Sequence, residues 1–185
     1  MNELNELFEQ AAEGNLPPDF DQWELAGKRG WTVAHVAAFH GHLPTGFDRW
    51  EISDECRGWT AAHAAAINGH LPPDFDRWEI ADEQRGWTVA HEAAKHGNLP
   101  PDFDQWEISD EWRISVAHVA AKHGHLPPDF DRWGLKDGFG LSVAHEAALR
   151  DGVHPLVTSG INPADLGKWF RTENYQNYLN ATREK

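Results

Sequence analysis

The sequence has little cysteine, few cations and no long hydrophobic run. Its one cysteine, Cys56, cannot form an internal disulfide, which fits a reducing compartment and predicts a cytoplasmic location. Lys and Arg number 16 against 30 Asp and Glu, and the net charge of −14 disfavours direct binding to nucleic acid. The acidic N-terminus does not resemble a secretory signal. No stretch approaches the roughly 20 apolar residues of a membrane helix, so we expect no membrane partner.

Signatures of catalysis are also missing. The chain has no glycine-rich phosphate loop and no Gly-x-Ser-x-Gly elbow. Nothing near Cys56 suggests an activated thiolate. Carboxylates recur in every unit of a repeat, whereas a catalytic acid–base pair would be singular. The recurring columns are Asp76, Asp104, Asp131 and Glu51, Glu79, Glu107. We therefore expect a protein that is not an enzyme, with no catalytic residue and no cofactor.

An internal repeat organises the sequence. Ala-His pairs recur at spacings of 28, 28, 27 and 27 residues, at His35, His63, His91, His118 and His145. A tryptophan column has the same period, at Trp50, Trp78, Trp106 and Trp133, and a truncated opening copy ends in Trp23. The units run over about 1–29, 30–57, 58–85, 86–112, 113–139 and 140–160. Such a period indicates a stacked repeat array, here residues 1–161, rather than one closed core.

Each unit predicts a short helix with recognisable ends. Thr32 is a good N-cap, and His35 stands at the third helical position, from which a side chain can reach back to the cap. The alanine-rich run to His40 favours helix. Gly41 is expected to end the helix in the left-handed conformation.

A second segment, PDFDRWEI in the unit at 58–85, predicts a helix of only about two turns. Its apolar residues Phe75, Trp78 and Ile80 should point inward, and the acidic Asp74, Asp76 and Glu79 should lie in water. Isolated helices this short are marginal in water, so stacking of neighbouring units must supply the missing burial.

The unit resembles an ankyrin repeat, whose pattern is G-x-T-P-L-H-x-A-A-x-x-G-H. The run from Gly58 to His70 reads GWTAAHAAAINGH, and the match covers about five copies, over residues 26 to 154. Valine or alanine replaces the signature proline, and the unit is 27–28 residues long against about 33 in the family. The resemblance implies an all-α, ankyrin-like repeat solenoid with shortened second helices and a C-terminal capping helix. Similar short, tryptophan-rich arrays occur in bacterial and phage proteins, which would place a phage-encoded chain in the host cytoplasm.

Twelve histidines raise the question of a metal site. The Ala-His column resembles the ankyrin signature histidine, which braces turns through hydrogen bonds. The pairs His40/His42 and His123/His125 could approach a zinc ion, but neither has a third ligand at the usual spacing. No metal is expected.

The resemblance also implies where a partner protein would bind. In ankyrin proteins, partners usually contact the turn tips and the inner helix face, which correspond to the variable positions of each unit. The candidate residues are Trp31, Phe39, Arg57, Trp59, Ile67, Arg85, Trp87, Lys95, Trp112, Arg113 and Lys122. Trp and Arg are enriched among residues that anchor interfaces. The turn tryptophans have a structural alternative, which is to pack on one another along the stack.

Two functions fit these features. The favoured one is a non-enzymatic adaptor or inhibitor that binds another protein through its inner concave face and turn tips. The alternative is an acidic decoy that imitates DNA and inhibits a nucleic-acid-binding protein with its outer face, as in phage or mobile-element counter-defence.

The C-terminal segment departs from the repeat. Residues 162–185 begin with a helix-start pattern, Asn162-Pro163-Ala164-Asp165, and predict a helix that caps the last unit. The other interpretation is a docking helix for a partner or for a second copy of the chain, which would make a homo-oligomer.

Overall fold

The computed structural model describes residues 3–27 and 30–151. The predicted C-terminal helix over 162–185 lies outside the described residues. The chain divides into two compact units, Met1–Phe103 and Asp104–Lys185, and each is described by itself. All regular structure in the described residues is helical, with only isolated antiparallel bridges in the loops.

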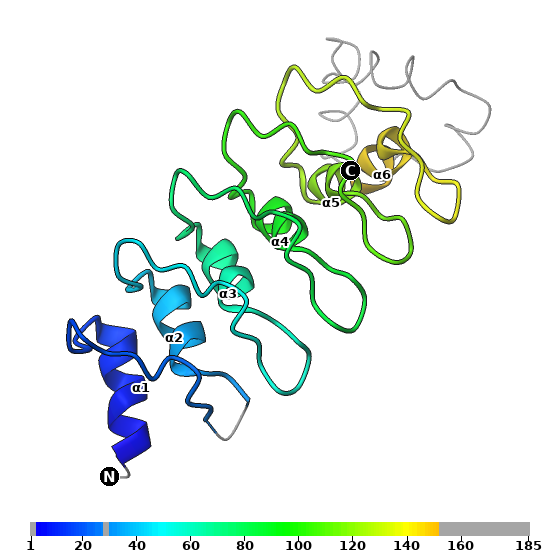
Figure 1. The fold of residues 1–185 in the computed structure, drawn as a ribbon. Coiled ribbons are helices and arrows are strands. Elements are labelled where there is room, and N and C mark those ends of the chain that lie inside the picture. Colours follow the sequence, from blue (N-terminus) through cyan, green and yellow to red (C-terminus); the bar gives the residue numbers. More distant parts are fainter. Residues whose placement is uncertain (1–2, 28–29, 152–185) are drawn as a thin grey trace, which may run out of the picture. The chain divides into compact units, whose positions relative to one another are not determined.

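The helices follow one another in chain order, as the sequence predicted for an all-α repeat. In the N-terminal unit these are α1 (Glu3–Glu13), α2 (Val33–His40), α3 (Ala61–Asn68) and α4 (Val89–His96), and each contacts the next (Figure 1). In the C-terminal unit α5 (Val116–His123) contacts α6 (Val143–Arg150). Apart from α1, each helix of the described residues has only eight residues, so packing rather than intrinsic propensity must hold it.

The start of α3 is fully satisfied by local hydrogen bonds. The first two helical amides donate to the preceding segment, from Ala61 to the Ile52 carbonyl (2.9 Å) and from Ala62 to the Trp50 carbonyl (3.2 Å). The third amide, of His63, donates to Thr60 Oγ1. The Thr60 amide donates in turn to His63 Nδ1 (3.3 Å), which confirms the predicted reciprocal cap.

The helix ends are closed by glycine and by the following unit. Gly41 has φ 78°, as predicted for a left-handed cap. A Cβ there would lie 3.0 Å from the His70 ring, whose Nδ1 is 3.0 Å from the Phe39 carbonyl at the end of α2. The next unit therefore contacts and hydrogen-bonds the terminus of the helix before it.

The second segment of each unit is shorter than the sequence predicted. The expected two-turn helix is wrong: PDFDRWEI forms two separate turns, closed by the amides of Phe75 and Ile80 on the carbonyls of Pro72 and Arg77. The Trp78 and Ile80 carbonyls accept bonds from the first amides of α4. Because these carbonyls cap the next helix, the segment keeps an extended path instead of coiling.

Aromatic rings on these outer segments form the second half of the core. Phe75 and Trp78 are 8% and 6% exposed, as predicted, whereas Ile80 is only half-buried. Phenylalanine and tryptophan alternate through the N-terminal unit in edge-to-face contacts, with ring centroids 4.9–5.5 Å apart. The ladder runs through Phe20, Trp23, Phe47, Trp50, Phe75, Trp78 and Phe103. In the C-terminal unit Trp106, Phe130 and Trp133 repeat the arrangement.

Buried histidines join successive units on the other side of the helices. His35 Nε2 lies 2.8 Å from the Trp59 carbonyl, and His63 Nε2 lies 2.9 Å from the Trp87 carbonyl. In the C-terminal unit His118 Nε2 lies 3.1 Å from the Leu141 carbonyl. Because Nδ1 accepts the cap amide, Nε2 must carry the proton and donate to the carbonyl. Each of these rings is therefore a neutral imidazole with one defined tautomer.

This arrangement predicts a loss of stability in mild acid. Burial lowers the pKa of His35 and His63 below 6.5, although the bonded carbonyls and the carboxylates Asp54 and Asp82 oppose the shift. The unfolded chain then binds more protons, so the unfolding free energy is flat above about pH 7.5 and declines as pH falls through about 6.5, by up to about 1.4 kcal/mol per pH unit per histidine.

Urea unfolding measured from pH 8 to pH 5 checks this prediction. The variant His63→Gln removes one of the two rings and should give a shallower decline than the parent chain. A parent profile that is flat down to pH 5.5, or one that rises toward acid, would contradict the buried neutral imidazoles.

Candidate protein-binding surface

The loop before each short helix is a small turn, here called the tip loop, and before α3, α4, α5 and α6 it is shaped by a buried aspartate. In the tip loop Asp54–Trp59, Asp54 Oδ1 accepts the amides of Arg57 (2.7 Å) and Trp59 (3.3 Å). Ser53 and Thr60 form an antiparallel bridge at its base. Asp82, Asp110 and Asp137 repeat these bonds. The carboxylate thus fixes the direction in which each tip presents its side chains.

The tip tryptophans do not stack on one another, the structural alternative considered for them. Trp31, Trp59 and Trp87 each lie over the imidazole of their own helix, with ring centroids 5.8, 5.6 and 4.8 Å apart. All three are half-buried. One side of each indole therefore covers the capping histidine, and the remaining surface is accessible.

Apolar side chains gather on the accessible side of α2 and α3. Trp31 contacts Phe39 edge to face at 5.8 Å, and Trp59 and Ile67 are half-buried at the equivalent positions one unit on. These four predicted residues thus occupy the corresponding inner face of two adjacent helices.

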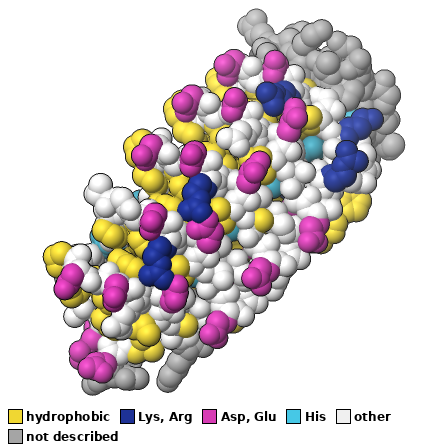
Figure 2. All heavy atoms as spheres, viewed as in Figure 1, with side chains coloured by type: hydrophobic (Ala, Val, Ile, Leu, Met, Phe, Trp, Pro, Cys, Tyr) yellow, Lys and Arg dark blue, Asp and Glu magenta, His cyan; other side chains and the backbone are white. Residues whose placement is uncertain are grey.

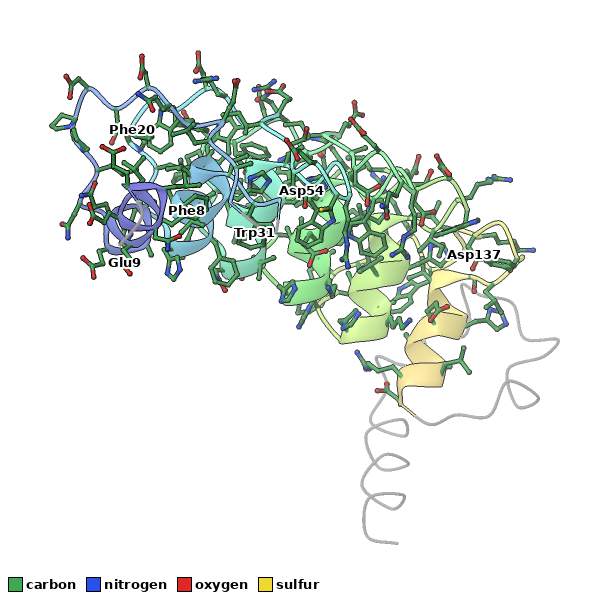
Figure 3. The ribbon with its side chains drawn as sticks, turned by 90° about the horizontal axis from the view of Figure 1, so that it is seen from below. Phe8, Glu9, Phe20, Trp31, Asp54 and Asp137 are labelled. Atoms are coloured by element: carbon green, nitrogen blue, oxygen red, sulfur yellow. The ribbon has the colours of Figure 1, made fainter. Side chains whose placement is uncertain are left out.

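A groove continues this apolar surface toward α1. It has a volume of about 840 Å³, within the usual range for ligand sites, and its apolar lining includes Leu4, Phe8, Trp31, Val36 and Trp59. Figure 3 shows Phe8 on the side of α1 toward α2, with Glu9 on the other side. The contribution of α1 was not foreseen, since the candidate residues began at Trp31.

Arginines stand on the tips beside the indoles. Arg57 lines the groove, and its guanidinium makes no hydrogen bond or ion pair with the part of the chain that the structure describes. Arg85 is exposed on the next tip. On the outer face, Arg49, Arg77 and Arg132 pair with Glu24, Glu51 and Glu107 of the preceding unit.

Glu92 on α4 is a component that the sequence analysis missed. Its residue exposure is 1%, and its carboxylate accepts from Trp87 Nε1 (2.8 Å), Lys95 Nζ (3.0 Å) and His96 Nε2 (3.0 Å). Two predicted residues, Trp87 and Lys95, are therefore held by one buried carboxylate. The sequence carried a signal for it, because Val36, Ala64 and Val119 are apolar at the same repeat position, and only Glu146 shares the carboxylate of Glu92.

In the C-terminal unit the three predicted residues are exposed, whereas the tip tryptophans of the N-terminal unit are half-buried. Trp112 is 45% exposed, Arg113 is exposed with φ 60°, and Lys122 is exposed on α5. Phe139, which was not predicted, is 75% exposed on the next tip. Eight of the candidates, up to Lys95, therefore belong to the N-terminal unit. The other three, from Trp112 onward, belong to the C-terminal unit.

The described residues contain no group of three or more potential metal ligands. His40 and His42 stack with centroids 6.4 Å apart, as do His123 and His125. Within residues 3–27 and 30–151, no helix has the length and apolar character to cross a bilayer.

Acidic side chains are distributed over the surface outside these residues. On the face seen in Figure 2 they recur along the molecule and lie beside the cationic side chains. Asp74, Asp76 and Glu79 are exposed, as predicted.

Comparisons with known proteins give a fold neighbour but no family. No family model matches the chain, and no curated protein matches it. A chain of a solved structure, the predatory endopeptidase Bd0816 from Bdellovibrio bacteriovorus in complex with immunity protein Bd3460, is similar with a TM-score of 0.57. The identity is 17%, and the match covers 90% of this chain and 97% of that chain. At this identity the likeness concerns the fold.

The Glu92 network predicts a graded response to substitution. Glu92→Ala should lower the unfolding free energy by about 2 kcal/mol, because three donors lose their acceptor and a cavity remains. Glu92→Val should cost less than about 1 kcal/mol, since valine fills the same position in two other units and apolar replacement of a buried ion pair is often neutral. Denaturant unfolding of both variants measures the difference. Equal losses would show that the hydrogen bonds, not the packing, dominate at this site.

Proposed function

We propose that this chain is a non-enzymatic, ankyrin-like protein-binding module that inhibits or recruits another protein through the accessible face of α2–α4 and the adjoining tip loops. The observation that carries the proposal is the continuous apolar surface of Trp31, Phe39, Trp59 and Ile67, extended by the groove against α1. Monomeric proteins rarely expose contiguous apolar patches without a binding role.

The composition of this surface supports protein recognition. Half-buried indoles are rigid, lose little conformational entropy on binding and are common among residues that dominate interface energies. Arg57 adds a guanidinium that has no internal carboxylate partner in the described chain. A rigid aromatic centre with a cationic edge is typical of a protein interface.

The fold neighbour supports an inhibitor in particular. Its structure is that of an endopeptidase with an immunity protein, and an array of this length covers most of the matched chain. By analogy, the partner here would be an enzyme whose activity the chain blocks. The matched structure therefore suggests peptidase activity as the first assay for any partner.

A second candidate is supported by the outer face. Its arginines are paired internally, whereas Asp74, Asp76 and Glu79 are exposed and make no ion pair in the described residues. This acidic face could occupy the site of a basic, nucleic-acid-binding protein, and its binding would be strongly salt-dependent.

Affinity purification from the source cell with two matched variants distinguishes these candidates. One variant carries Trp59→Ala and Ile67→Glu on the inner face, and the other carries Asp74→Asn, Asp76→Asn and Glu79→Gln on the outer face. We expect the inner-face variant to bind the retained protein at least about 30-fold more weakly, as for loss of an interface hot spot, and the outer-face variant to bind it almost normally.

Far-UV circular dichroism and urea unfolding of both variants provide the control for folding. The purified partner is then assayed for enzyme activity with and without the chain. The opposite pattern, with binding lost only when the acidic face is neutralised, would replace the proposal by the decoy function.

A further inference from the structure

Two neighbouring tip loops of the C-terminal unit carry an aromatic residue where other tips carry arginine. Arginine precedes the tip glycine at Arg57-Gly58 and Arg85-Gly86, but Trp112 and Phe139 stand at this position in the last two tips. Trp112 is 45% exposed and Phe139 is 75% exposed. Leu141, two residues beyond Phe139, is 36% exposed. The C-terminal tips therefore present apolar side chains where the other tips present cations.

Arg113 replaces a glycine of the repeat and adopts a backbone conformation that is unfavourable for a residue with a Cβ. The equivalent residues Gly30, Gly58, Gly86 and Gly140 have φ values of 67–84°, and Arg113 adopts φ 60° in the same turn. Glycine takes this left-handed conformation freely, whereas a side chain with a Cβ is disfavoured there. Strain of this kind is commonly retained at functional sites. The Arg113 side chain makes no hydrogen bond or ion pair with the described residues that would explain its retention.

The two tips are tied to each other. The Gly138 amide donates to the Trp112 carbonyl at 2.8 Å, and a Cβ on Gly138 would lie 2.5 Å from that oxygen. Asp110 fixes its turn by accepting the amides of Trp112 and Ile114. Asp137 likewise accepts the amides of Phe139 and Leu141. Figure 3 shows Asp137 in the loop that leads to α6. The exposed aromatic residues are thus held by a defined backbone contact.

The cations Arg113 and Lys136 on these tips have no ion-pair partner among the described residues. The side chains of Arg113 and Lys136 are exposed and form no ion pair in the described residues, although Glu111 is exposed on the same tip. In a chain with 30 acidic and 16 basic residues, unpaired cations do not result from a shortage of carboxylates. An apolar centre with cations at its edge complements apolar groups that lie next to carboxylates.

We propose that Trp112, Phe139 and Leu141, with Arg113 and Lys136 at the edge, form a second docking site, here called the tip patch. It binds a segment of the partner protein that carries large apolar side chains next to Asp or Glu. The inference rests on the proposed function, because it assumes that the chain binds another protein. It adds a site built from residues of the C-terminal unit.

A variant that restores the repeat tests this site in the full chain. Trp112→Arg with Arg113→Gly recreates the Arg-Gly pair of the other tips, and Phe139→Ser removes the second ring. Because glycine relieves the left-handed residue, the variant should keep its fold and gain on the order of 2–4 °C in Tm. Leu25→Ser is the matched control, since Leu25 is also 36% exposed but lies in the N-terminal unit.

The probe is a displayed library of random peptides of about 12 residues, selected on the parent chain and counter-selected on the variant. We expect enriched peptides that combine Trp, Phe or Leu with Asp or Glu, and at least tenfold weaker binding of their synthetic forms to the variant by fluorescence polarisation. The Leu25→Ser chain should bind them like the parent.

Peptides without acidic residues, peptides that bind the variant equally well, or no enrichment over the variant would each overturn the tip patch. Binding of the natural partner to the two variants distinguishes a failure of the tip patch from a failure of the proposed function. A partner that binds the tip variant normally but is lost from the Trp59→Ala, Ile67→Glu variant would refute the tip patch and leave the inner-face function standing.

Discussion

One hydrogen bond links each of α2, α3 and α5 to the repeat that follows it: the Nε2–H of a buried histidine donates to a backbone carbonyl 23 or 24 residues later. The same ring closes the cap of its own helix through Nδ1, so one side chain fixes both a helix start and the next tip loop. This bond requires a neutral imidazole of one tautomer, because the carbonyl only accepts and the cap amide only donates. In the N-terminal unit a tip tryptophan lies over each of these imidazoles and shields the ring from water.

The aromatic ladder explains how so short a unit can still be stable. Two turns replace a second helix, and the carbonyls of those turns satisfy the first amides of the next helix. Phe and Trp rings then supply the apolar area that the missing helical turns would have buried. With the interior built from repeated positions, the variable positions are free to differ between units. This freedom gives the N-terminal unit an apolar inner surface and the C-terminal tips exposed rings.

The repeat made the fold predictable, because each structural requirement recurs and can be checked against its copies. Thr32, His35 and Gly41 have the capping roles that their positions predicted. The second segment was mistaken for a helix because its proline start and aspartates fit either a helix or a turn, and the sequence does not show that its carbonyls bond the next helix. Predicted site residues were accessible at Trp112 and Arg113, but Glu92 and Phe139 were missed. Glu92 stands where three other units have an apolar residue, and Phe139 stands where other tips have arginine. Differences between the copies of the repeat therefore carry as much information as the repeated pattern.

The protonation state of the linking histidines tests the central claim most directly. A long-range ¹H–¹⁵N correlation spectrum of the full chain near neutral pH distinguishes the two neutral tautomers from imidazolium. His35, His63 and His118 should each show a protonated Nε2 and an unprotonated Nδ1, with the Nε2 proton protected from exchange with water. Imidazolium at these positions, the opposite tautomer, or rapidly exchanging Nε2 protons would contradict the account.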